Sequence, residues 1–132
     1  MILVVDDERG LADTLVAMLE LIGYRSTAAY SAEEAMRILC SEEPDLIISD
    51  VVMPGTDGVQ LAIMARFLWP HVRILLVSGN AATQEIIDAA RADGHAFELL
   101  AKPVPPKLLL VKVVSVLRDG PGIERRKAAG AS

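Results

Sequence analysis

The sequence has one cysteine, no long apolar run and no excess of positive charge. Cys40 alone cannot form an internal disulfide, which suits a reducing compartment. No apolar stretch approaches the roughly 18 residues that span a bilayer, and no charged N-terminal region with a cleavage site is present. The net charge of −5 argues against direct nucleic-acid binding, which normally needs a basic stripe. We therefore expect a cytoplasmic protein that binds neither nucleic acid nor membrane.

The chain has enough apolar residues for one core and is too short for two ordinary domains. It holds 132 residues, of which 52% are hydrophobic. The last helical pattern ends at Arg118, and a run of aspartate, glycine and proline at 119–122 would break any continuation. We predict one domain over residues 1–118 and a flexible C-terminal tail over residues 119–132, in which only residues 125–127 are locally basic.

Five short apolar runs alternate with five helical patterns. The runs lack period-2 alternation, as is typical of parallel strands buried on both faces. Five βα units with right-handed crossovers predict an α/β fold with a doubly wound, five-stranded parallel sheet, for which the flavodoxin-like strand order 2-1-3-4-5 is a common solution. The expected strands are residues 2–5, 25–30, 46–49, 72–78 and 97–101, and the expected helices are residues 11–22, 32–40, 57–68, 82–92 and 105–118.

Charged and polar side chains stand where four of these strands end. Asp6 and Asp7 follow the first strand, Asp50 follows the third, Ser78 closes the fourth and Lys102 follows the fifth. Because such sheets bind ligands at the carboxyl ends of their strands, we expect these side chains to meet. Two unit charges about 4 Å apart repel by roughly 4 kcal/mol at an effective dielectric constant of about 20, so three carboxylates need a proton or a cation. Mg²⁺ prefers carboxylate and water oxygens and is the apt partner.

Together these fragments resemble the receiver domain of two-component response regulators. The resemblance covers about residues 1–118, and its fragments occur in the family's order at the matching strand ends. They are Asp6-Asp7, Asp50 followed by Met53-Pro54-Gly55 and Asp57-Gly58, Ser78-Gly79, and Lys102-Pro103.

The resemblance implies a phosphorelay function. Asp50 would take a phosphoryl group from a phosphohistidine of a histidine kinase or histidine phosphotransfer protein, forming an acyl phosphate. Lys102 would pair with Asp50 and then with the phosphoryl group, to which Ser78 would donate its hydroxyl. The protein would show self-phosphorylation and slow self-dephosphorylation without being a turnover enzyme. The implied Mg²⁺ ligands are Asp6, Asp7, Asp50 and the backbone carbonyl of Val52. The resemblance also implies a cis peptide bond between Lys102 and Pro103.

The sequence departs from the family at two positions of mechanistic interest. Leu99 stands where receivers usually carry an aromatic switch residue, three positions before the lysine. Phe97 lies on the same face of the strand and could fill part of that role with Ser78. Val52, two residues after Asp50, offers no polar group to position a hydrolytic water. We therefore expect slow self-dephosphorylation.

Other interpretations remain open. Taken one at a time, these residues have simpler explanations. Asp6-Asp7 could be an acidic pair at a helix N-terminus, Asp50 could be a loop acid, and Lys102 could be a surface lysine. Their convergence at one edge of the sheet disfavours these three explanations. A degenerate receiver acting as a phosphorylation-independent interaction module is the alternative function. The chain lacks the phosphate-binding loop that a flavin or dinucleotide site needs after the first strand. It also lacks the second acid, at position 52, that a haloacid dehalogenase-like phosphatase would need.

The remaining residues have simpler roles. Cys40 is predicted to be a small core hydrophobe of the second helix and Trp69 a packing residue at the end of the third. His71 and His95 lie at strand starts, and we assign them no chemical role. The last helix is apolar almost all round, so the face made by the fourth helix, fifth strand and fifth helix is predicted to bind a partner or form a homodimer.

Overall fold

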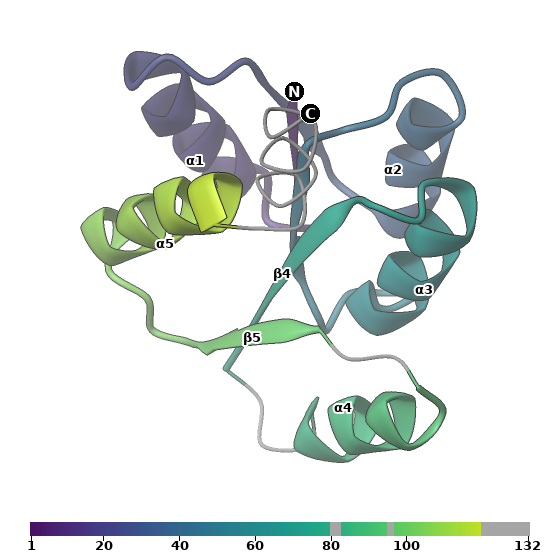
Figure 1. Cartoon of the computed structure of the whole chain (residues 1–132). Coiled ribbons are helices and arrows are strands. Elements are labelled where there is room, and N and C mark those ends of the chain that lie inside the picture. The colour runs from purple at the N-terminus through teal and green to yellow at the C-terminus, as the bar shows by residue number, and fades with distance from the viewer. Residues whose placement is uncertain (80–82, 95–96, 120–132) are drawn as a thin grey trace, which may run out of the picture.

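In the computed structural model, which describes residues 1–79, 83–94 and 97–119, all five strands form one parallel sheet (Figure 1). The strand order is β2-β1-β3-β4-β5, which confirms the predicted fold class. The strands are β1 (Ile2–Val5), β2 (Ser26–Ala29), β3 (Leu46–Asp50), β4 (Arg73–Ser78) and β5 (Glu98–Ala101). The helices are α1 (Arg9–Leu21), α2 (Ala32–Leu39), α3 (Gly58–Leu68), α4 (Thr83–Ala92) and α5 (Pro106–Asp119).

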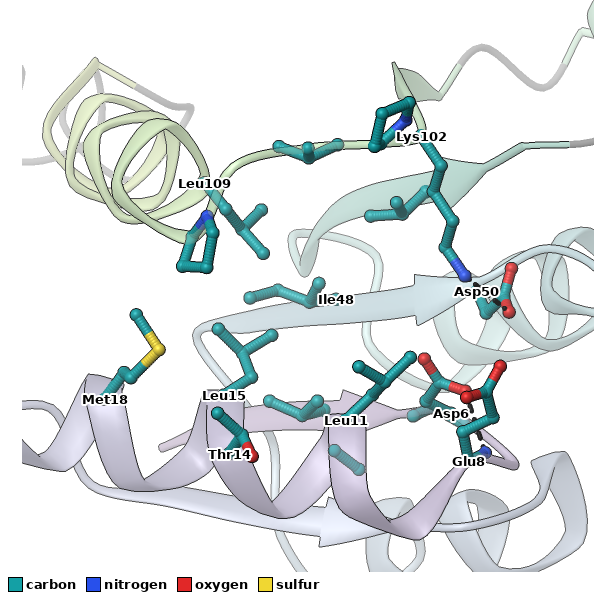
Figure 2. Close-up of a pocket in the computed structure, with 17 residues that line it drawn as sticks. Asp6, Glu8, Leu11, Thr14, Leu15, Met18, Ile48, Asp50, Lys102 and Leu109 are labelled. Carbon is teal, nitrogen blue, oxygen red and sulfur yellow. Dashed lines mark hydrogen bonds and ion pairs between the residues drawn. The ribbon is translucent and has the colours of Figure 1, made fainter.

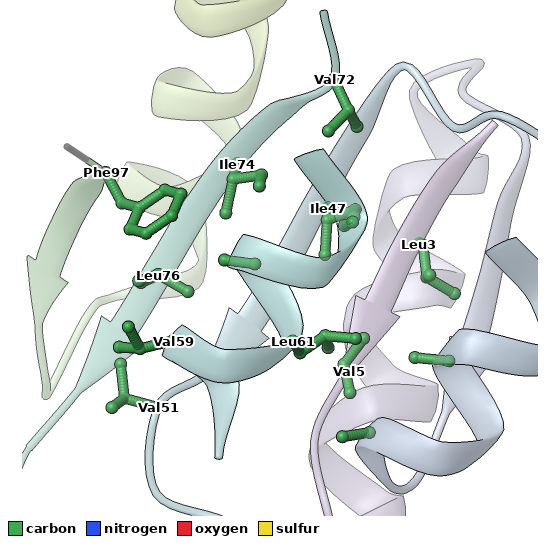
Figure 3. Packing of buried hydrophobic residues seen from close by; sticks show 14 of the residues in the cluster. Leu3, Val5, Ile47, Val51, Val59, Leu61, Val72, Ile74, Leu76 and Phe97 are labelled. Carbon is green, nitrogen blue, oxygen red and sulfur yellow. The ribbon is translucent and has the colours of Figure 1, made fainter. Parts of the chain in front are cut away.

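The helices cover both faces of the sheet, with α1 and α5 on one face and α2 and α3 on the other (Figure 1). Successive strand residues point to opposite faces, so each strand contributes to two apolar clusters. In β1, for example, Leu3 and Val5 join the cluster beneath α2, α3 and α4 (Figure 3), whereas Ile2 and Val4 join the cluster beneath α1 and α5. Burial on both faces fixes the strand ends, and with them the side chains that follow.

Two helix starts are capped by side chains. Ser31 accepts a hydrogen bond from the backbone N–H of Glu34 at 3.1 Å at the start of α2. Asp57 and Gln60 form a full capping box at the start of α3, with Asp57 accepting from the Gln60 N–H at 2.8 Å. Because α3 begins at this box, the loop between Asp50 and the helix is short and well defined.

The predicted burial of Cys40 is wrong, because its side chain is exposed. Cys40 is the residue after the last turn of α2, where Ala35 and Leu39 already fill the buried face. Leu11, which the expected helix over residues 11–22 begins with, is also 50% exposed. Trp69 does pack against the core, and its indole N–H donates to the Leu39 carbonyl at 2.9 Å.

The two histidines and the C-terminal tail differ in how far the structure describes them. His71 is exposed in the turn before β4, while His95 and most of the predicted tail lie outside the described residues. Among the helices that the structure describes, none is long and apolar enough to cross a membrane.

Gly58 is the tightest point of the backbone behind Asp50. A Cβ at Gly58 would lie 2.1 Å from the Asp50 carbonyl oxygen and 2.9 Å from the Val51 Cα. The Gly58 N–H also donates to the Val51 carbonyl at 2.8 Å. Only glycine allows this approach of the β3–α3 loop to the strand end.

We predict that Gly58→Ala lowers the free energy of unfolding by about 3 kcal/mol or more, because backbone atoms must move apart. Gly10→Ala in α1 is the matched control, since its Cβ meets nothing within 4 Å, and it should stabilise the protein by up to about 1 kcal/mol. Urea unfolding of the two variants measures both effects. An unchanged midpoint for Gly58→Ala would show that the loop yields freely.

Candidate functional site

The sheet brings four of its strand ends to one edge. Val5 is in register with Ser49, Asp50 with Val77, and Ser78 with Ala101. The residues that follow or close these strands therefore converge: Asp6, Asp7, Asp50, Ser78 and Lys102.

Asp6, Asp7 and Asp50 form a compact carboxylate cluster. Each offers one oxygen, and these three atoms all lie within 4.8 Å of one another. Asp7 is exposed, whereas Asp50 has only 13% of its side chain exposed. The oxygen ligands of an octahedral Mg²⁺, bound at about 2.1 Å, stand roughly 3 to 4 Å apart, so small side-chain movements suffice. The donor set therefore fits a hard divalent cation.

The positive charge of Lys102 lies beside the carboxylate cluster. Its ammonium nitrogen lies 3.1 Å from Asp50 Oδ2 (Figure 2). Its backbone N–H donates to the Ser78 carbonyl at 2.8 Å, and the following Lys102-Pro103 bond is cis, as predicted. Lys102 thus ties the end of β5 to the ends of β3 and β4.

The cluster shifts the pKa of two of its members. Burial raises the pKa of Asp6 above 3.8, and the negative charges of Asp50 and Asp7 raise it further. A hydrogen bond that Asp6 accepts from the Glu8 N–H lowers the pKa but does not cancel this rise. Burial by itself would lower the pKa of Lys102, but the hydrogen bond and charge of Asp50 more than compensate, and its pKa is raised above 10.5. Lys102 is therefore charged throughout the physiological range.

Ser78 and Gly79 form the rim of the site nearest β5. The Ser78 side chain is buried at the end of β4. A Cβ at Gly79 would stand 3.1 Å from the Lys102 Cβ, so a larger residue would press against the lysine stem. The absence of a side chain at Gly79 lets Lys102 pass close to the strand end and reach Asp50.

The two residues considered for the switch pack in the same apolar cluster but differ in burial. Leu99 is half-buried in β5, in register with Leu76. Phe97 precedes β5, and its buried ring lies among core residues (Figure 3), with the Arg66 guanidinium 4.9 Å from its centroid. Val52 follows Asp50 with its side chain 47% exposed.

Sequence reasoning missed an apolar groove that adjoins the carboxylates. It lies between α1 and the start of α5 and has a volume of about 420 Å³ (Figure 2). Asp6, Glu8, Asp50 and Lys102 line one end, and Met18 and Leu109 are among its apolar residues. Leu11, Leu15 and Leu19 recur every four residues in α1 and were a signal, but periodicity does not say whether another helix covers them.

An open doubly wound sheet with acids and a lysine at its carboxyl edge defines an α/β domain whose site lies at the ends of its strands. The family model of the response regulator receiver domain matches residues 2–114. The chain therefore belongs to the receiver domains of two-component response regulators.

Individual relatives agree with this assignment. The chain is 38% identical over 109 residues to the response regulator protein FleR of Pseudomonas aeruginosa, covering 83% of this chain and 23% of FleR. It spans about half of other curated relatives, such as PhoB of the same organism. The CheY-like receiver domain protein of Methanospirillum hungatei superposes with a TM-score of 0.80 at 29% identity, over 89% of this chain and 93% of that one. TrrA of Thermotoga maritima, solved with Mg²⁺ and BeF, has a TM-score of 0.74 at 30% identity, over 87% and 96%.

We predict that Asp6→Asn stabilises the protein at neutral pH without divalent cations, by roughly 0.5–1 kcal/mol after allowance for solvent screening. The pKa of Asp6 is higher in the folded state than in the unfolded state, where it is 3.8. At a pH above the folded-state pKa, the ionised Asp6 lowers the stability of the fold, and at a pH below 3.8 it does not. The gain should therefore vanish in acid, and saturating Mg²⁺ should reverse its sign because the variant loses a ligand. Thermal unfolding across pH measures this. Asp93→Asn, at an exposed position, is the control, and an equal gain in both variants would contradict the prediction.

Proposed function

We propose that this domain receives a phosphoryl group on Asp50 from a phosphohistidine of a histidine kinase or histidine phosphotransfer protein. The observation that carries the proposal is the position of Asp50, part-buried within a carboxylate cluster and 3.1 Å from the Lys102 ammonium. A nucleophile flanked by cations is what phosphoryl transfer requires, because the protein supplies mainly position and electrostatic stabilisation.

The chain's residues have distinct parts in the proposed transfer. An Asp50 carboxylate oxygen attacks phosphorus, the phosphorus–nitrogen bond breaks, and the imidazole leaves as the acyl phosphate forms. Lys102 moves from the carboxylate to a phosphoryl oxygen, and the Ser78 hydroxyl donates to another. Asp6, Asp7, Asp50 and the Val52 carbonyl would hold Mg²⁺, which when bound neutralises charge on the phosphoryl oxygens.

The finer features of the proposal follow the family. The expected location is the cytoplasm, and Ser78 with Leu99 and Phe97 would form the switch. Homodimerisation or partner binding through α4, β5 and α5 remains a prediction, supported by Leu108 and Val111, which are 57% and 62% exposed on α5. Leu99 keeps the alternative open, a degenerate receiver that acts as an interaction module without phosphorylation.

The decisive experiment is incorporation of phosphate from a small acyl phosphate, followed by intact mass. We expect the wild type to gain the mass of one phosphoryl group with Mg²⁺ and none after chelation. Asp50→Asn should gain none, while Asp93→Asn, a change of the same kind at an exposed site, should label like the wild type. A folded wild type that never labels would favour the interaction module.

We also predict that Val52→Asn speeds loss of the phosphoryl group, by roughly threefold or more, because an amide there can orient the attacking water. The position is exposed, so the substitution should not disturb the core. Val52→Ile is the apolar control and should decay like the wild type. Equal decay rates for Val52→Asn and wild type would refute the prediction.

A further inference from the structure

The groove beside the carboxylate cluster has an apolar wall that the described part of the chain leaves partly open to water. Its volume of about 420 Å³ lies within the usual range for bound ligands, roughly 300–1,000 Å³. Leu11 is exposed, and Leu15 and Met18 are only half-buried. Covering this surface would be favourable because it removes apolar area from water. Figure 2 shows these α1 side chains facing the α5 side of the groove.

The charged end of the groove is predominantly negative. Asp6, Glu8 and Asp50 line it against a single ammonium, Lys102, which already pairs with Asp50. Asp7 adds a further carboxylate to the same cluster. An occupant matched to this site is apolar along the groove and positively charged at the carboxylate end.

We propose that the occupant is the chain's own segment 123–127, with Ile123 in the groove and Arg125, Arg126 and Lys127 at the carboxylates. The segment reads Ile-Glu-Arg-Arg-Lys, so it combines one branched aliphatic residue with three successive cations against one acid, Glu124. Because it is tethered to α5, its effective concentration is about millimolar, which a free ligand rarely reaches.

The length of the chain allows this placement. Helix α5 starts beside the groove at Pro106 and runs 14 residues to Asp119, about 20 Å at 1.5 Å per residue. An extended chain covers about 3.4 Å per residue, so residues 123–127, which follow the reversal, return about 17 Å, and the long arginine and lysine side chains extend this reach. Residues 120–122 are Gly-Pro-Gly, a sequence suited to reversing the chain direction.

Docking of this segment would oppose cation binding at the same carboxylates. The three basic side chains neutralise the cluster, so Mg²⁺ must displace them, and Mg²⁺ in turn releases the segment. Under the proposed function, on which this consequence rests, the segment restrains phosphorylation until Mg²⁺ and a donor are present.

Methyl NMR of the full chain tests the docking directly. Met18 lines the groove, whereas Met36 packs in the cluster on the opposite face of the sheet and serves as an internal control. We expect the Met18 methyl signal to shift in a variant carrying Arg125→Ala, Arg126→Ala and Lys127→Ala, with Met36 unchanged. High salt should move the wild-type Met18 signal towards that of the variant. Identical Met18 signals, or a difference lost on strong dilution, would overturn intramolecular docking.

Calorimetric titration with Mg²⁺ tests the consequence. The triple variant should bind Mg²⁺ about three- to tenfold more tightly than wild type at low salt, and the difference should vanish at high salt. A control with Arg25→Ala, Arg37→Ala and Arg91→Ala removes the same charge from exposed positions elsewhere and should change the affinity less than about twofold.

The outcomes separate this inference from the proposed function. Equal Mg²⁺ affinities and equal Met18 signals in wild type and variant would overturn the inference while phosphorylation of Asp50 stood. A wild type that binds no Mg²⁺ would count against the proposed function, and the Met18 comparison would still decide whether the segment docks.

Discussion

Repulsion among three carboxylates at one sheet edge is the constraint on which the site depends. The strands that carry Asp6, Asp7 and Asp50 are buried on both faces, so they cannot separate to relieve it. Lys102 offsets part of this charge. The pKa of Asp6 is raised chiefly by burial, and the charges of Asp50 and Asp7 add to that rise. Affinity for a cation therefore follows from the fold itself, because packing elsewhere in the protein holds the charges together.

The backbone packs closely at this edge of the sheet. Gly58 leaves no room for a methyl group behind Asp50, and Gly79 lets the Lys102 stem pass beside the end of β4. Phe97 is held in the core with Arg66 against its ring, and Leu99 is the nearer of the two switch candidates to the register pair Ser78–Ala101.

The sequence was sufficient for features set by local pattern. Buried strands are continuous apolar runs, and polar residues at their ends meet once the strands lie parallel, so the grouping of Asp6, Asp50 and Lys102 was predictable. The strand order came from the common topology of doubly wound sheets and not from local pattern. The error at Cys40 arose where a helix ends, since one residue beyond the last turn faces solvent. The groove was not predictable, because the exposure of Leu11 depends on how far α5 stands from α1, which is a matter of tertiary packing.

Phosphorylation of Asp50, under the proposed function, would change the electrostatics in a definite direction. An acyl phosphate carries about one more negative charge than the carboxylate that it replaces. Lys102 pairs with Asp50, and its backbone N–H donates to the Ser78 carbonyl, so stronger attraction of the lysine acts on the ends of β4 and β5 together. These strand ends lead into α4 and α5, and α5 carries the exposed Leu108 and Val111. The charge change at one carboxylate would therefore act first on the edge of the sheet where the apolar surface lies.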